Sequence, residues 1–112
     1  MKWYLARLLF RSLINRQPGG LAEDTLRLVR AKNAAEARKK AVRFGKEAEH
    51  SYKNPYGELV RWRLVECIDV YEIPDPLEDG AEVYSLLLVP RELKQVQKMF
   101  TLKGGKRWVR EV

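Results

Sequence analysis

The sequence contains one cysteine and one histidine among its 112 residues. A single cysteine excludes an intramolecular disulfide and any zinc site built from several cysteines, which favours a reducing compartment. No stretch approaches the roughly 18 uninterrupted apolar residues that a membrane-spanning helix needs. Arg7 and Arg11 also interrupt the apolar N-terminus before a signal-type core can form. We therefore expect a cytoplasmic protein without a secretory or membrane segment.

The motifs of common enzymes are missing as well. The chain has no phosphate-binding loop, no dinucleotide fingerprint, no serine-centred elbow and no zinc motif. Cys67 stands in the apolar centre of a predicted strand, where a buried, inert thiol is a better interpretation than a nucleophile. His50 has no second histidine or nearby cysteine, which favours a surface residue over a metal ligand. The sequence thus predicts no catalytic residue, no cofactor and no metal site.

Charge is plentiful but unevenly placed. The 22 Lys and Arg outnumber the 15 Asp and Glu, for a net charge of +7. Residues 1–56 hold 13 basic and 5 acidic residues, whereas residues 57–112 hold 9 and 10. From Glu66 to Glu82 there are seven acids and no base. Such runs are usually solvated surface; the alternative is that unlike patches pair within the fold or between two subunits.

Composition and length indicate one packed domain. Hydrophobic residues make up 46% of the chain, which is enough for a core and excludes a disordered class. The length is typical of one domain. We expect a single α+β domain over residues 1–102 and a basic C-terminal tail over residues 103–112.

The first part of the chain predicts two strands. Residues 2–14 fit both a strand and a helical stripe, and the absence of a capping residue together with an aromatic pair favours the strand. A Pro-Gly-Gly run predicts a loop over residues 15–20. Residues 24–31 then alternate as a short strand does.

The clearest helix signal follows this strand. Asn33 can cap the first turn, and Glu36 stands three residues later, as in a capping box. The apolar face is mostly alanine, which predicts a helix lying close against a sheet. Its apolar positions are Ala37, Ala41, Phe44 and Ala48.

The second half predicts two further strands and a second helix. Asn54 to Gly57 has the composition of a type I turn. It leads into a long strand over residues 58–73, in which we expect a bulge or bend because about sixteen residues is long for one strand. Residues 81–89 read as the next strand, and Pro90 suits the first turn of a helix.

These elements predict an α+β fold with an antiparallel sheet of about four strands and two helices on one face, in the order β-β-α-β-β-α. The long strand is apolar on both faces, so the sheet face without helices needs a cover of its own. Either the sheet curls on itself or it packs against a second subunit. We expect a homodimer through that uncovered face, because two-fold pairs are the commonest small assemblies.

One local pattern points to anions. Trp62 lies between Arg61 and Arg63, and in a strand the ring and the two arginines point to opposite faces. The plain interpretation is a core tryptophan with two solvent-facing arginines. The alternative is a basic sheet surface that meets phosphates, together with a tail whose aromatic ring stacks on a base. The candidate nucleic-acid or anion-binding residues are Arg7, Arg11, Arg61, Arg63, Lys106, Arg107, Trp108 and Arg110.

Several short motifs also carry a family resemblance. The pattern Gly-Glu-x-Val-x-Trp occupies residues 57–62, and Asp-Gly-x-Glu-Val occupies residues 79–83. With the Trp-Tyr-Leu-Ala run at residues 3–6 and the alanine-rich helix, they make the chain similar to a small bacterial family, domain of unknown function 4288. The resemblance covers about residues 2–86 and implies no agreed activity or catalytic residues.

Three functional classes remain. The favoured one is a non-catalytic homodimeric binding module that recognises a macromolecular partner, because catalytic motifs are absent, the charge is split and one sheet face is uncovered. The alternative is a nucleic-acid-binding protein that uses a basic sheet face and the C-terminal tail. The third is an enzyme acting on a small anionic substrate.

Overall fold

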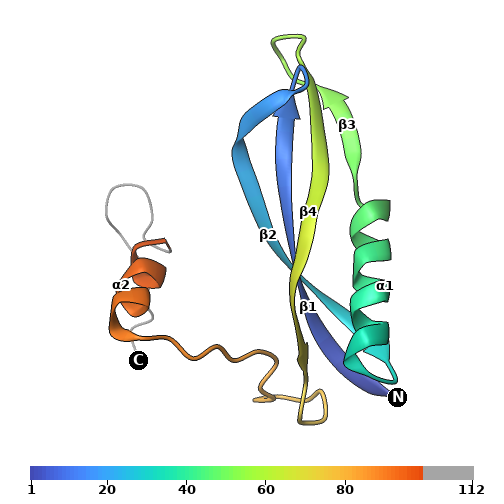
Figure 1. The fold of residues 1–112 in the computed structure, drawn as a ribbon, viewed down its shortest axis with the longest axis vertical. Helices are drawn as coiled ribbons and strands as arrows, with labels where there is room; N and C mark the ends of the chain where they lie inside the picture. The colour runs from blue at the N-terminus through green and yellow to red at the C-terminus, as the bar shows by residue number, and fades with distance from the viewer. Residues whose placement is uncertain (100–112) are drawn as a thin grey trace.

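The computed structural model describes residues 1–99. In this range the order of elements along the chain is β-β-α-β-β-α, which confirms the predicted α+β class. The predicted boundary at residue 102 and the tail over residues 103–112 lie outside the described residues. The elements are β1 (Lys2–Ile14), β2 (Gln17–Ala31), α1 (Ala34–Glu47), β3 (His50–Lys53), β4 (Leu59–Glu72) and α2 (Pro90–Met99) (Figure 1).

β1 and β2 form one long antiparallel hairpin. Asn15 and Arg16 make its turn with φ values of 49° and 69°. Positive φ at both positions is typical of the two-residue hairpin turn whose twist matches its strands. The strand predicted over residues 2–14 is confirmed. The loop predicted over residues 15–20 is too long, because Gln17 already pairs with Ile14.

The sheet has the strand order β2-β1-β4-β3, and all its neighbouring strands are antiparallel. β1 and β4 are therefore central, and β2 and β3 are edges. The edge position of β2 explains how a strand accommodates Pro18, since the missing N–H of a proline is tolerated where no further strand pairs.

β4 confirms both the long strand and the expected irregularity. Its pairing with β1 shifts register twice, and the shifts leave Val65 and Ile68 without partners on β1. An extra residue of this kind changes the alternation of the side chains that follow. Cys67 consequently pairs with Leu8 and lies on the buried side of the sheet. Strict alternation from Trp62 would instead have placed Ile68 on the buried side and Cys67 on the opposite side.

The fourth strand is β3, and the strand predicted over residues 81–89 is wrong. β3 pairs with β4, but all four of its residues are exposed, so it has no apolar alternation from which to predict it. Within residues 1–99, residues 81–89 pair with no strand. Glu82 and Tyr84 still contact side chains of β4, and the segment then runs away from the sheet towards α2 (Figure 1).

α1 packs on one face of the sheet, against β1, β2 and β4 (Figure 1). We call this side the α1 face and the opposite side the far face. The predicted cap is confirmed, since Asn33 Oδ1 accepts a hydrogen bond from the Glu36 amide at 2.9 Å. A Cβ at Gly45 would come within 2.9 Å of Leu64, so α1 lies very close to β4. The buried cluster between helix and sheet comprises Tyr4, Ala6, Leu8, Phe10, Val29, Ala31, Ala37, Ala41 and Cys67.

α2 begins at Pro90 as expected, but within residues 1–99 it contacts no other helix or strand. The prediction of two helices on one sheet face therefore holds for α1 and is wrong for α2, which stands apart in Figure 1. In the same range, neither helix combines the length and the apolar composition that crossing a membrane requires.

We expect Asn33→Ala to lower the free energy of unfolding by about 1 kcal/mol, because it removes the side chain that caps α1. Urea denaturation followed by far-ultraviolet circular dichroism measures the loss. Asn33→Asp is the matched control, since aspartate caps as well as asparagine. Equal losses in both variants would contradict the capping role.

Candidate functional site

The far face of the sheet carries the candidate site. Its residues alternate with the buried ones along β1, and cross-strand partners in the paired register share a face. The far-face positions include Leu5, Arg7, Leu9, Arg11 and Leu13 of β1, Ala22, Asp24, Leu26 and Leu28 of β2, and Arg61, Arg63, Glu66, Asp69 and Tyr71 of β4.

Three arginines, Arg11, Arg61 and Arg63, form the basic end of this face. Arg11 pairs directly with Arg63 across β1 and β4, and Arg61 pairs with Leu13 on the next rung. None of the three is in an ion pair within residues 1–99, and the buried Nε of Arg61 has no hydrogen-bond partner there. Like charges directly opposite each other destabilise a ladder. The structure thus brings together three of the four sheet arginines that the sequence predicted as neighbours and gives them no counter-charge in the described chain.

Arg7 lies on the same face, but its charge is already neutralised. The Nε of Arg7 lies 2.9 Å from both carboxylate oxygens of Asp24, and its Nη2 also donates a hydrogen bond to Asp24 Oδ2. The guanidinium carbon lies 5.7 Å from the centre of the Tyr84 ring. Hydrogen bonding to Asp24, and then to Tyr84, raises the pKa of Arg7 above its ordinary value. Arg7 therefore ties β1 to β2 and to the segment after β4.

Acidic side chains occupy the rungs beyond the basic end. The Tyr84 hydroxyl donates to Asp69 Oδ2 at 2.6 Å, and the Tyr71 hydroxyl donates to Glu82 Oε2 at 2.9 Å. The two tyrosine rings meet edge to face at 5.4 Å. The bond to Asp69 chiefly raises the pKa of Tyr84, and the bond to Glu82 chiefly raises that of Tyr71. We call this region the acidic half; its carboxylates are Asp24, Glu66, Asp69 and Glu82.

Leu9 and Val65 lie where the basic end meets the acidic half, and we call them the apolar junction. Val65 is the extra residue at one register shift and is 53% exposed. Together with Leu21, the junction lines a hollow of about 290 Å³ on this face. Leu26 and Leu28 extend the exposed apolar area along β2. Exposed apolar side chains grouped on one sheet face mark contact sites more often than plain solvent-facing surface does.

The other predicted residues lie elsewhere. Cys67 is buried, and burial raises the pKa of its thiol, as expected for an inert core cysteine. His50 is exposed on β3, as predicted for a surface histidine. Within residues 1–99 no three His, Cys, Asp or Glu side chains cluster closely enough to hold a metal ion. Four predicted anion contacts lie outside the described residues: Lys106, Arg107, Trp108 and Arg110.

The comparison with protein families matches residues 3–85 to one described as Domain of unknown function (DUF4288). The chain belongs to this family. The DUF4288 match spans all four strands and α1, includes Tyr84 and stops before α2. Comparisons with curated proteins and with solved structures find no match. Because the DUF4288 description assigns no activity, function has to be argued from the geometry of the surfaces themselves.

Proposed function

We propose that this DUF4288 chain is a non-catalytic interaction module that forms a homodimer through the far face. The observation that carries the proposal is the sequence of side chains along β4. Arg61 and Arg63 come first, Val65 follows at the junction, and Glu66 and Asp69 come next. A surface that is basic on one side of an apolar point and acidic on the other is complementary to an inverted copy of itself.

Two-fold symmetry converts this order into specific contacts. Let the far faces of two copies pack against each other around a two-fold axis. The axis lies between the two sheets, runs at right angles to β4 and passes over Val65. Arg63 then lies opposite the partner's Glu66, and Arg61 lies opposite the partner's Asp69. The same contacts recur on the other side of the axis, as an isologous interface requires. Charge complementarity of this kind fixes the register of the two copies, and the apolar junction supplies the dry centre of the contact.

The segment after β4 gives further support for contacts between chains. Leu86 and Leu87 are 56% and 94% exposed, and α2 exposes Leu93 while contacting no other element of residues 1–99. Apolar side chains in such numbers outside the core of their own chain are typical of surfaces that a second chain covers.

The second candidate is binding of nucleic acid, and the arginine pair favours it. Arg11 and Arg63 lie side by side on the sheet without carboxylate partners in the described chain. Such a pair can meet the phosphates of a nucleic-acid backbone. The homodimer is the better proposal because it uses the arginines, the acids and the apolar junction together, whereas nucleic acid uses the arginines alone.

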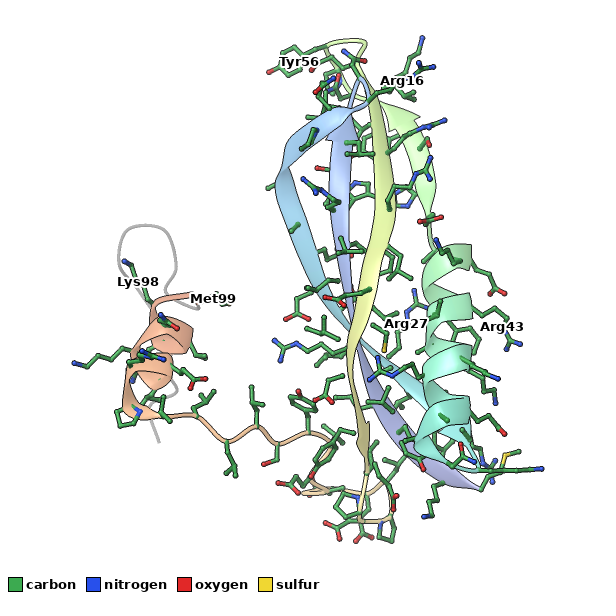
Figure 2. All side chains as sticks on the ribbon, viewed as in Figure 1. Arg16, Arg27, Arg43, Tyr56, Lys98 and Met99 are labelled. Atoms are coloured by element: carbon green, nitrogen blue, oxygen red, sulfur yellow. The ribbon has the colours of Figure 1, made fainter. Side chains whose placement is uncertain are left out.

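Light scattering coupled to size-exclusion chromatography tests the homodimer. We expect a dimer mass at high micromolar concentration and a monomer mass for Val65→Glu, because the substitution places a carboxylate at the apolar centre of the contact. Tyr56→Glu is the control: Tyr56 is 87% exposed at the turn before β4 (Figure 2), so this variant should stay dimeric. A monomeric wild-type chain, or an unchanged mass for a folded Val65→Glu variant, would overturn the proposal.

A further inference from the structure

The α1 face has an uncovered half that the far-face proposal does not use. α1 has 14 residues and spans about 21 Å at 1.5 Å per residue, whereas the 13 residues of β1 span about 43 Å at 3.3 Å per residue. The helix therefore ends about halfway along the strands, as Figure 1 shows. Beyond Ala48, no helix of residues 1–99 lies above the sheet on this side.

A hollow of about 370 Å³ occupies this uncovered half. Phe10 and Trp62, from the two central strands, are among its lining residues and give it an aromatic floor. The two edge strands provide the sides, with Arg27 on β2 and both His50 and Tyr52 on β3. Figure 2 shows Arg27 on the side of the sheet that α1 occupies. The volume lies within the roughly 300–1,000 Å³ of small-molecule pockets.

The β2 side offers one cation that has no counter-ion among the described residues. Arg27 forms no ion pair within residues 1–99. Glu23 also lines the hollow, and its Oε1 accepts a hydrogen bond from the Thr25 hydroxyl at 3.0 Å, while the carboxylate has no cationic partner within residues 1–99. A guanidinium is a planar fork that binds carboxylates and phosphates through two parallel hydrogen bonds. Of the residues that line this hollow, Arg27 is the one that can bind an anionic group in this way.

The β3 side offers two flat rings in a fixed orientation. The His50 and Tyr52 rings stack with centres 6.0 Å apart and planes 19° apart. His50 Nδ1 lies 3.0 Å from the Ala48 carbonyl oxygen, which can only accept, so Nδ1 carries the proton. In the neutral ring Nε2 is then a hydrogen-bond acceptor. Two stacked rings beside an aromatic floor suit a planar, aromatic group.

We infer that this hollow binds a small planar aromatic molecule that carries a carboxylate or a phosphate, with its ring against Trp62 and its anionic group on Arg27. Aromatic carboxylates and mononucleotides share this chemistry. The site uses the α1 face, so it does not depend on the homodimer formed through the far face.

Fluorescence of Trp62 tests the inference directly. A Trp3→Phe/Trp108→Phe chain keeps Trp62 as its single tryptophan, and it is titrated with benzoate and with adenosine monophosphate. We expect saturable quenching by at least one of them and about 10- to 100-fold weaker binding in an added Arg27→Gln variant, the usual loss for a hydrogen bond to a charged group. Benzamide and adenosine, which lack the anionic group, should bind more weakly by a similar factor.

The matched control is Arg30→Gln, because Arg30 lies on the same strand but on the far face, 5.5 Å from the Trp3 ring. It should leave the affinity unchanged. Saturation by benzoate alone assigns the site to carboxylates, and saturation by adenosine monophosphate alone assigns it to phosphates. Absence of saturation by both at millimolar concentration, or equal affinity in the Arg27→Gln variant, overturns the inference.

Discussion

Leu8→Ala will lower the free energy of unfolding by about 2–5 kcal/mol, the range measured for truncation of a fully buried leucine. Leu8 is 0% exposed and is one of the two largest fully buried side chains of residues 1–99. Its surroundings include Ala37 and Ala41, whose methyl groups are too short to fill the space left behind. Because α1 is already in close contact with the sheet, the cavity cannot collapse.

Urea denaturation of both chains at one protein concentration measures this loss, since dimer formation would add its own concentration-dependent stability. Leu87→Ala is the matched control. Leu87 is 94% exposed, so its truncation should change the free energy by less than about 0.5 kcal/mol. A loss below about 1 kcal/mol for Leu8→Ala would contradict the tightly packed interface between α1 and the sheet.

The sequence predicts those parts of the fold that local chemistry determines. Asn33 and the alanine face define α1 without reference to other elements. The turn after Asn54 is equally local: Gly57 donates to the Asn54 carbonyl at 2.9 Å and takes a φ of 79°. β3 could not be predicted in this way, because its four exposed residues form a strand only by pairing with the edge of β4.

The residues of the candidate site could be predicted only where the side chains of β4 alternate regularly between the two faces of the sheet. Arg61 and Arg63 face Leu13 and Arg11 before either register shift, so the basic end follows from the sequence. Glu66 does not follow from it: strict alternation from Arg63 would place Glu66 on the α1 face. The extra residue Val65 moves it to the far face, and which residue bulges depends on the contacts of a whole strand pair.

The hollow on the α1 face is a still less local feature. Its lining residues come from all four strands, and they meet because the strand order places β2 and β3 at opposite edges of the sheet. Arg27 and His50 are distant in sequence and belong to no common motif. What places them around one hollow is the length of α1, which ends before the strands do.

Reversing the charge of either Arg63 or Glu66 alone will dissociate the proposed dimer, and reversing both charges will restore dimer formation. In the Arg63→Glu variant, the introduced carboxylate of each copy faces the partner's Glu66, and in Glu66→Arg two arginines meet. Each variant should dimerise at least about 100-fold more weakly, because like charges placed opposite each other cost several kcal/mol.

A 1:1 mixture of the two variants should form a heterodimer, in which both facing pairs are again of opposite sign. The double variant should form a homodimer for the same reason. Sedimentation velocity measures each mass.

This set of variants separates the symmetric pairing of β4 strands from the other functions that the same arginines could serve. A chain that uses Arg63 to hold nucleic acid would lose retention on heparin in Arg63→Glu but keep it in Glu66→Arg, which retains Arg63 and gains positive charge, so the two variants of the mixture would elute separately from heparin. A chain in which Arg63 merely supports the fold would lose thermal stability in the single variant and show no preference for the heterodimer. Only contact between Arg63 and the partner's Glu66 predicts two weakened homodimers, a restored heterodimer and a restored double variant together. Persistence of the Arg63→Glu dimer at low micromolar concentration would remove the proposed arrangement.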